Sequence, residues 1–113
     1  MSGAWVVGAD LGGTKIALGL IDPSGRIRAR RRFPTDSEKG PESVLRRIVD
    51  HIVALQSHLP DNASIGAVGL CTPGPVDCDR GVLHDPPNLP DLHHIPLRQM
   101  LKAQLSDESR LRE

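Results

Sequence analysis

The sequence predicts an α/β fold in which one sheet combines an antiparallel meander with a parallel strand. Three observations favour this fold. Two β-rich runs flank a glycine turn between residues 5 and 21, an apolar stripe recurs at helical spacing between residues 45 and 59, and a continuous apolar run follows at 64–71. A helix that connects two strands of one sheet brings the chain back in the same direction, so the last strand is expected to be parallel to an earlier one. The expected order is βββαβ.

The first three elements are expected to be strands joined by tight turns. They comprise "WVVGAD" (5–10), "KIALGLI" (15–21) and "RIRARRRF" (26–33), and the "DPSG" between the last two is typical of a turn. In the third run, alternate arginines share one face by the strand period of two. Because the chain has no net charge, we interpret this run as a solvated strand face rather than a nucleic-acid site. The expected faces are Arg26, Arg28, Arg30 and Arg32 on one side and Ile27, Ala29 and Phe33 on the other, with Arg31 as the exception.

A helix is expected to follow the meander. Pro41 suits its first turn, Glu42 complements the positive end of its dipole, and Pro60 ends it. His51 and His58 lie among polar positions and are expected to face solvent. The apolar stripe that would face the core consists of Leu45, Ile48, Val49, Ile52, Leu55 and Leu59.

The second half of the chain begins with "SIGAVGLC" (64–71), whose continuous apolar character is typical of a strand covered on both faces. The expected elements after it are a proline-framed turn "TPGPVD" (72–77), a short strand "GVLH" (81–84), a loop "DPPNLPDLHH" (85–94) and a helix from Pro96 to Leu105. The cysteines and histidines here match no zinc or disulfide spacing, so we expect them to be free. They are Cys71, Cys78, His84, His93 and His94.

Composition limits the function classes. The chain has 113 residues, with 14 basic and 14 acidic side chains, so its formal net charge is zero. That length fits one domain or part of one, and the neutral balance argues against binding nucleic acid or an anionic membrane through bulk charge. No apolar run approaches the ~20 residues that cross a bilayer, and no signal peptide is visible. We therefore expect a cytoplasmic protein.

The stretch "GADLGGTKIALGLID" (8–22) carries the clearest chemistry. Gly12 and Gly13 let a ligand approach the backbone N–H groups, which form a concavity suited to phosphate oxygens, and Thr14 and Lys15 add to that electropositive patch. Asp10, in an apolar strand, is expected to need a partner, and Mg²⁺ or its waters would suit it. The alternative is a plain hairpin turn in which Asp10 caps neighbouring backbone. Neither the Walker order nor the dinucleotide spacing is present.

These residues resemble the first phosphate motif of the ROK family of sugar kinases, repressors and open reading frames. A second stretch, "AVGLCTPGPVDCDRGVLHDPPNLPDL" (67–92), is similar to the signature region of that family. The resemblance implies the actin/hexokinase-type ATPase fold, which is ribonuclease H-like. It also implies that residues 1–113 form an incomplete N-terminal lobe of a glucokinase-like enzyme.

The resemblance implies a role for each matching residue. Asp10 would position the magnesium of the metal–nucleotide, through water, and Gly12, Gly13, Thr14 and Lys15 would line the ATP phosphates. Gly74, Pro75 and Asn88 would contribute to the sugar pocket. A type II turn centred on Pro73 and Gly74 presents a backbone amide in a fixed direction, and an Asn side chain offers both donors and an acceptor to sugar hydroxyls. Structural roles remain the alternative for Pro75, for Asp77 and for Asn88 between its prolines.

The resemblance also implies what lies outside the chain. The catalytic aspartate of the family belongs to a Glu-Asn-Asp-Ala-Asn-like segment, expected beyond Glu113, as are the zinc-binding His/Cys motif and the adenosine-binding lobe. The intact protein is expected to be a homodimer that phosphorylates a hexose with ATP and Mg²⁺, and glucose is the first candidate for that hexose. The chain alone is expected to be inactive. Three alternatives stay open. The first is a non-catalytic nucleotide- or sugar-binding fragment, and the second is a sugar-responsive regulator, for which a helix-turn-helix would have to precede the phosphate motif. The third is a decayed open reading frame without a function.

Overall fold

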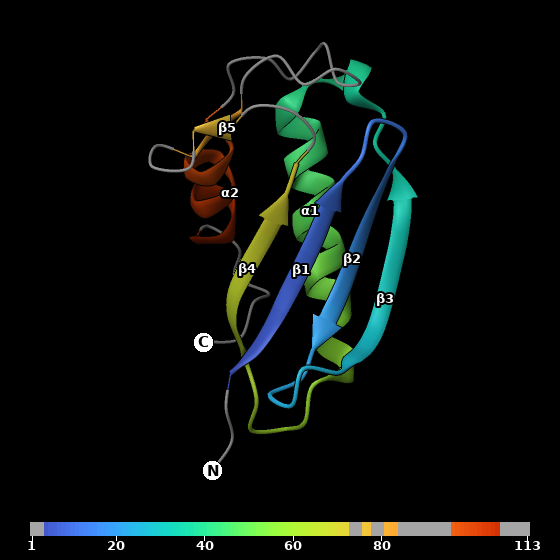
Figure 1. The fold of residues 1–113 in the computed structure, drawn as a ribbon, viewed down its shortest axis with the longest axis vertical. Coiled ribbons are helices and arrows are strands. Elements are labelled where there is room, and N and C mark those ends of the chain that lie inside the picture. Colours follow the sequence, from blue (N-terminus) through green and yellow to red (C-terminus); the bar gives the residue numbers. More distant parts are fainter. Residues whose placement is uncertain (1–3, 73–75, 78–80, 84–95, 107–113) are drawn as a thin grey trace.

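The computed structural model describes residues 4–72, 76–77, 81–83 and 96–106. Four strands form one sheet in the order β3-β2-β1-β4 (Figure 1). Their bounds are β1 Trp5–Leu11, β2 Lys15–Ile21, β3 Ile27–Pro34 and β4 Ile65–Cys71. β1 and β3 are antiparallel to β2, whereas β4 is parallel to β1. The expected βββαβ order and the parallel last strand are confirmed.

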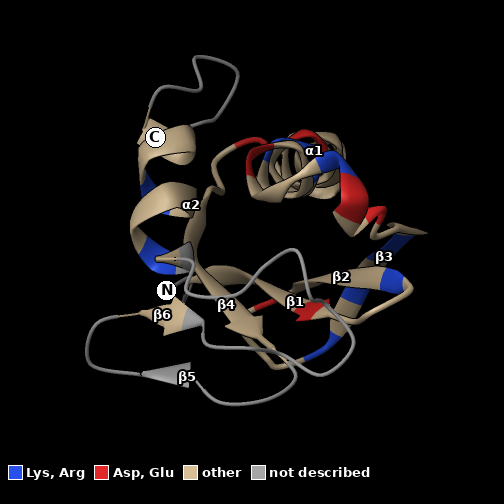
Figure 2. Cartoon of the chain, turned by 90° about the horizontal axis from the view of Figure 1, so that it is seen from above, with Lys and Arg blue, Asp and Glu red and all other residues tan. Residues whose placement is uncertain are grey.

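Two helices lie on the same side of this sheet (Figure 2). The helix α1, Pro41–Leu55, connects β3 to β4, and α2, Leu97–Ser106, packs beside α1. Short 3-10 turns flank α1 at Ser37–Lys39 (η1) and Gln56–His58 (η2). A two-residue strand β5, Val76–Asp77, pairs antiparallel with β6, Val82–Leu83. The last two residues of the expected "TPGPVD" turn are therefore strand, because they find a pairing partner in the next apolar dipeptide.

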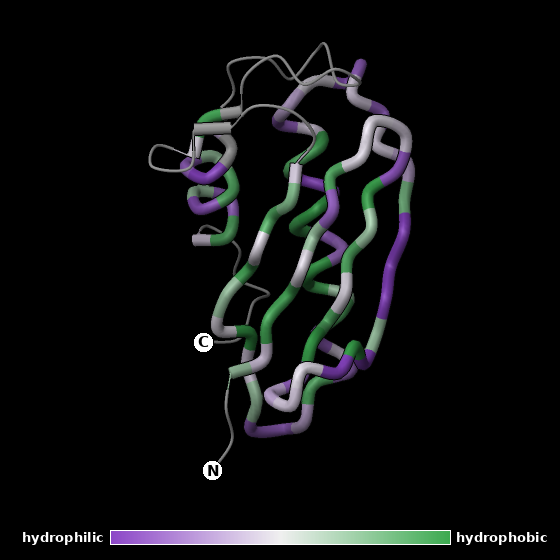
Figure 3. The backbone as a smooth tube through the Cα atoms, in the orientation of Figure 1, coloured by the Kyte–Doolittle hydropathy of each residue, from purple (hydrophilic) through white to green (hydrophobic). Residues whose placement is uncertain are grey.

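The core lies between α1 and the sheet. Every residue of the predicted helical stripe from Leu45 to Leu59 is buried, which confirms the helix and its inward face. The predicted end at Pro60 is wrong, because α1 ends at Leu55 and Leu59 follows the 3-10 turn η2. The tube in Figure 3 shows the corresponding pattern: apolar positions run along α1, β1 and β2, while β3 is mostly hydrophilic. At roughly 1.5–3 kcal/mol for each large aliphatic side chain, this interface is the main source of stability. The sheet side of the core is Val7, Ala9, Leu11, Ile16, Leu18, Leu20 and Phe33.

The predicted face of Ile27 is wrong. Leu20 pairs with Ala29 but Ile21 pairs with Ile27, so the ladder has an irregularity at Arg28. A bulge adds one residue to a strand and reverses the face of the residues beyond it. Ile27 is consequently 46% exposed and lies against Gly19, on the face opposite Ala29 and Phe33.

The prediction that β4 is covered on both faces is also wrong. Ala67, Gly69 and Cys71 are exposed, while Val68 and Leu70 pack against the core. The helices of the described residues cover one face of the sheet only, so β4 is buried on one side. We call the other side the open face. By the strand register it contains Gly8, Asp10, Ala17, Gly19, Arg30, Arg32, Gly69 and Cys71. None of the described helices has the length and apolar character that spanning a membrane requires.

Candidate phosphate-binding turn

The turn between β1 and β2 lies at the edge of the sheet where the parallel strands β1 and β4 end (Figure 1). The structure brings the sequence-predicted residues together here. Gly12 and Gly13 are half-buried, and Thr14 and Lys15 are exposed at the tip. Carboxyl ends of parallel strands are where α/β sheets bind ligands, so the turn is well placed for a binding role.

Gly12 is required by the close approach of backbone across the turn. Its N–H donates a 3.1 Å hydrogen bond to the carbonyl oxygen of Lys15. A Cβ on Gly12 would lie 2.6 Å from that same oxygen, a distance that real side chains do not reach. Any larger residue would therefore force the turn apart.

Thr35 ties the turn to the end of β3. Its N–H donates to the carbonyl oxygen of Thr14 at 2.8 Å, and its hydroxyl donates to the carbonyl oxygen of Gly12 at 2.7 Å. Thr35 is fully buried. Sequence reasoning missed it; the only available signal was that an antiparallel β2–β3 pair places the residue after Pro34 opposite Thr14.

The turn leaves backbone donors available on its outer side. The peptide between Gly12 and Gly13 is trans, so the N–H of Gly13 points away from Thr35, opposite to the Gly12 carbonyl. Within the described ranges, neither the Gly13 nor the Thr14 N–H has a hydrogen-bond partner. Two unpaired N–H groups beside the exposed Lys15 ammonium give the turn the donor set that phosphate oxygens need.

Asp10 stands on the open face, two residues before Gly12. It is exposed, so the expected cost of a carboxylate in an apolar strand does not arise: the neighbouring positions on this face are Ala17 and Cys71, and water reaches it. Among the described residues its carboxylate has no hydrogen bond or ion pair, so it is available to a cation. No group of three His, Cys, Asp or Glu side chains in that part of the chain is arranged to hold a metal. A single free carboxylate beside a phosphate site is the arrangement typical of Mg²⁺.

A groove of about 590 Å³ extends from Asp10 across the open face. Glycines form its floor, and arginines of β3 line its far side. Arg30 and Arg32 have no acidic partner in the described residues. The expected solvated strand face is thus confirmed for these two arginines. The groove residues that bear on the argument are Gly8, Asp10, Gly19, Ile27, Arg30 and Arg32.

Several predicted residues lie outside the described ranges. Gly74, Pro75 and Asn88, assigned to the sugar pocket, are among them, as are Cys78, His84, His93 and His94. Cys71, by contrast, is described; it is free and exposed, as expected.

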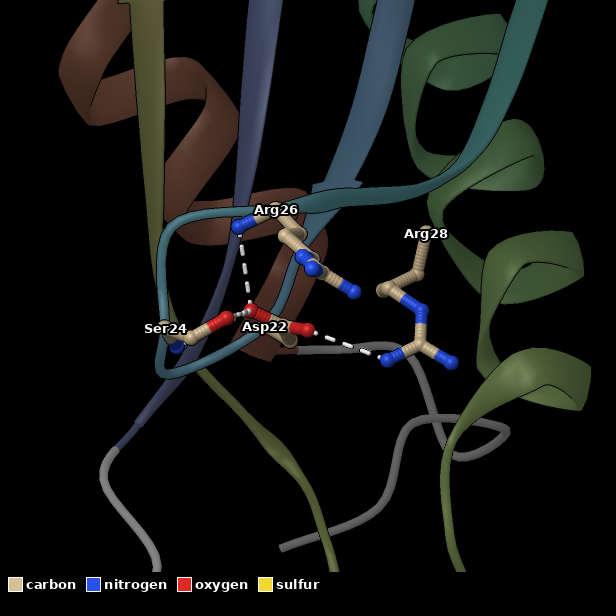
Figure 4. A network of polar contacts seen from close by, with 4 residues as sticks. All are labelled: Asp22, Ser24, Arg26 and Arg28. Carbon is tan, nitrogen blue, oxygen red and sulfur yellow. Dashed lines mark hydrogen bonds and ion pairs between the residues drawn. The ribbon is translucent and has the colours of Figure 1, made fainter.

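A second polar cluster lies at the opposite end of the sheet and is structural (Figure 4). One carboxylate oxygen of Asp22 accepts hydrogen bonds from the Ser24 hydroxyl (2.6 Å), the Ser24 N–H (2.9 Å) and the Arg26 N–H (3.0 Å). Its other oxygen pairs with Arg28 at 3.1 Å. The Ser24 hydroxyl, followed by the Arg26 N–H, holds the pKa of Asp22 well below its usual range. This cluster closes the β2–β3 turn.

His51 is not the solvent-facing residue that the sequence predicted, whereas His58 is exposed as expected. The His51 ring stacks on Phe33 with the centroids 4.0 Å apart, and its Nδ1 accepts a 2.7 Å hydrogen bond from Arg31. Burial, and then the charge of Arg31, lower the pKa of His51. Arg31 is exposed but lies on the helix side of β3, opposite to Arg30 and Arg32, and there it is the partner of this histidine.

Comparison with known proteins places the chain in a family. The sequence model of the ROK family matches residues 6–113. The chain is 35% identical over 96 residues to a glucokinase of Thermotoga maritima, covering 85% of this chain and 29% of that protein. It is also 35% identical over 98 residues to an N-acetylmannosamine kinase of Escherichia fergusonii, covering 87% of this chain and 31% of that protein.

Solved structures agree with the sequence comparisons. A ROK hexokinase from Thermus thermophilus superimposes with a TM-score of 0.77 and 36% identity over 90% of this chain and 32% of that one. A ROK glucokinase from Streptomyces griseus, solved with glucose and AMPPNP, superimposes with a TM-score of 0.70 and 30% identity over 91% of this chain and 31% of that one. The chain thus spans about a third of the length of these relatives. The expected actin/hexokinase-type fold is confirmed, and the chain belongs to the ROK family.

Proposed function

We propose that this chain binds the phosphates of Mg²⁺·ATP and serves the ATP-dependent phosphorylation of a hexose. The observation that carries the proposal is the Gly12–Lys15 turn. It presents the unpaired N–H groups of Gly13 and Thr14 together with the Lys15 ammonium at the end of a parallel strand pair. Hydrogen bonds to a charged group contribute roughly 1.5–3 kcal/mol each, so these donors together make a substantial favourable contribution to nucleotide binding.

Asp10 fits the metal of such a nucleotide. Its exposed carboxylate lies at the end of β1, two residues before the turn, and would hold the ion through water, as the resemblance implies. When bound, Mg²⁺ neutralises phosphate charge and polarises the transferred group. The role of Asp10 is to orient the hydrated ion, and that of Lys15 is to bind the phosphate oxygens. Catalysis of phosphoryl transfer depends mainly on this positioning and charge compensation.

The names of the relatives support a substrate class. Those compared above are two glucokinases, a hexokinase and an N-acetylmannosamine kinase, and one of the glucokinases was solved with glucose. We therefore propose a hexose as the phosphate acceptor, with glucose as the first candidate. Gly74, Pro75 and Asn88 would contribute to its binding site. Because the resemblance puts the catalytic aspartate beyond Glu113, we expect the 113-residue chain to bind nucleotide without transferring phosphate. A positioned general base contributes about 10²–10⁴-fold to such a step.

Calorimetric titration of the chain with Mg²⁺·ATP tests the proposal, and the chain offers a matched pair of variants. Gly12→Ala places a methyl group 2.6 Å from the Lys15 carbonyl oxygen, whereas Gly69→Ala places one in open space on the open face. We expect saturable binding by the wild type and by Gly69→Ala, and a loss of at least about tenfold in affinity for Gly12→Ala, the equivalent of about one charge-assisted hydrogen bond. Binding that is equal in all three proteins would contradict the role of the turn.

A further inference from the structure

We propose that Thr35 is a positioning residue for the phosphate-binding turn, and that Arg47 holds Thr35 in place. The inference rests on the proposed function, since it assigns Thr35 to the site formed by residues 12–15. Neither residue is expected to contact the nucleotide. Thr35 is fully buried, and Arg47, on α1, donates a hydrogen bond to the Thr35 carbonyl oxygen.

The conformation of the turn is set from outside because the turn itself is flexible. Adjacent glycines have more backbone freedom than any other residue pair and lose more entropy when they are ordered. Within the turn, one bond, from the Gly12 N–H to the Lys15 carbonyl oxygen, restrains them. The two bonds from Thr35 add a restraint on the carbonyl groups of Gly12 and Thr14.

The hydroxyl of Thr35 controls the direction of the Gly13 N–H. A trans peptide unit holds its C=O and N–H in opposite directions. The 2.7 Å bond from the Thr35 hydroxyl draws the Gly12 carbonyl inward, and the Gly13 N–H on the same peptide is therefore turned outward. If this bond is lost, the peptide is free to rotate and the donor no longer faces the ligand.

Arg47 extends the network into α1. Its guanidinium donates to the carbonyl oxygens of Pro34 and Thr35, each at 2.6 Å, and of Asp36 at 3.3 Å. These three carbonyls form the bend that leaves β3, where Asp36 has a left-handed φ of 45°, unusual for a residue with a side chain. One planar guanidinium thus fixes a strained bend that carries Thr35, and the helix is coupled to the turn through it.

The test compares three variants of the chain in titrations with Mg²⁺·ATP. Thr35→Val removes the hydroxyl at constant shape, and Thr35→Ser retains it. Ile52→Val trims a buried side chain in the last part of α1 and serves as the control for a general loss of stability. We expect the dissociation constant to rise about tenfold in Thr35→Val and to stay within about twofold of the wild type in the other two.

Amide hydrogen exchange supplies a readout that needs no ligand. The Gly12 amide, which is bonded across the turn, is expected to exchange about tenfold faster in Thr35→Val, while amides in the middle of α1 keep their wild-type rates. Arg47→Lys, which keeps the charge but loses the planar fork, is expected to raise the Gly12 rate less than Thr35→Val.

The possible results distinguish the positioning role of Thr35 from the proposed binding of the nucleotide. If the wild type binds Mg²⁺·ATP and Thr35→Val binds it with the same affinity, the positioning role of Thr35 is overturned and the proposed function is left intact. No saturable binding by the wild type would overturn the proposed function and, with it, the assignment of Thr35 to a nucleotide site. Equal weakening in Thr35→Val and Ile52→Val would also overturn the positioning role, because stability alone would then explain the effect.

Discussion

The hydroxyl of Thr35 donates a 2.7 Å hydrogen bond to the carbonyl oxygen of Gly12, 23 positions earlier in the chain. This contact joins the end of β3 to the turn that begins β2, and both are at the edge of the sheet where β1 and β4 end (Figure 1). The turn residues supply the hydrogen-bond donors, and the buried side chain of Thr35, which follows β3, sets their direction. Binding and stability are therefore expected to respond differently to changes at the exposed tip and beneath it.

Lys15 is exposed and has no ion pair among the described residues, so its ammonium contributes little to stability. We expect Lys15→Gln to weaken Mg²⁺·ATP binding about tenfold or more while the free energy of unfolding stays within about 0.5 kcal/mol of the wild type. Calorimetry and urea unfolding measure the two quantities. Lys102→Gln, an exposed lysine on α2, is the control, and an equal loss of affinity there would show that bulk charge is responsible.

Asp10 is expected to make nucleotide binding dependent on magnesium. In the wild type, removing Mg²⁺ with a chelator should weaken ATP binding, because the carboxylate then faces the phosphates without an intervening cation. In Asp10→Asn the affinities with and without Mg²⁺ should converge. The exposed Asp61 provides the control, since Asp61→Asn should keep the full magnesium effect. A magnesium effect that persists in Asp10→Asn would exclude Asp10 as the residue that orients the ion.

His51 is expected to make stability fall in mild acid. Burial and the charges of Arg31 and Arg47 lower its pKa in the folded chain, and Asp50 opposes them. The unfolded chain therefore binds the proton first, so the free energy of unfolding should decrease as the pH falls through about 6.5 and below. His51→Phe keeps an aromatic ring to stack on Phe33 but does not titrate. Urea unfolding at several pH values between about 5 and 7.5 should show a shallower slope for this variant, and an unchanged slope would refute the assignment.

Asp22 is expected to make stability fall at a lower pH than His51 does. Its pKa is lowered in the folded state, so the stability it contributes is present above the ordinary carboxyl pKa of about 4 and is lost as the pH falls below that value. Because the Ser24 hydroxyl is the largest cause, Ser24→Ala should raise the pKa of Asp22, as followed by NMR of its carboxyl carbon. Asp22→Asn should flatten the pH dependence of unfolding below about pH 4. A Ser24→Ala chain with the wild-type carboxyl titration would contradict this account.

Local patterns in the sequence were sufficient for most of the fold. The helical period of the stripe from Leu45 to Leu59 predicted both the helix and its buried face, and the glycine turn between two β-rich runs predicted the first hairpin. These features are encoded by neighbouring residues, and each is confirmed. The position of Gly12, Gly13, Thr14 and Lys15 at this turn was predicted for the same reason, and their role in phosphate binding stays a prediction.

The features that sequence reasoning missed depend on contacts between distant segments or on packing. The irregularity at Arg28 moved Ile27 to the open face, because nothing in an alternating run marks where an extra residue enters the ladder. The exposed side of β4 could not be deduced because coverage of a strand depends on other elements. Nothing in the local sequence distinguishes Thr35 from any other residue after a strand, because its contact with Gly12 forms only in the folded chain.

The most direct test of the central claim is an NMR titration of the ¹⁵N-labelled chain with Mg²⁺·ATP. The account predicts that the amide signals of Gly13 and Thr14 shift most, that the shifts saturate, and that adenosine without phosphates does not produce them. If those two signals stay in place while the nucleotide binds elsewhere, or does not bind at all, the turn between β1 and β2 is not a phosphate site.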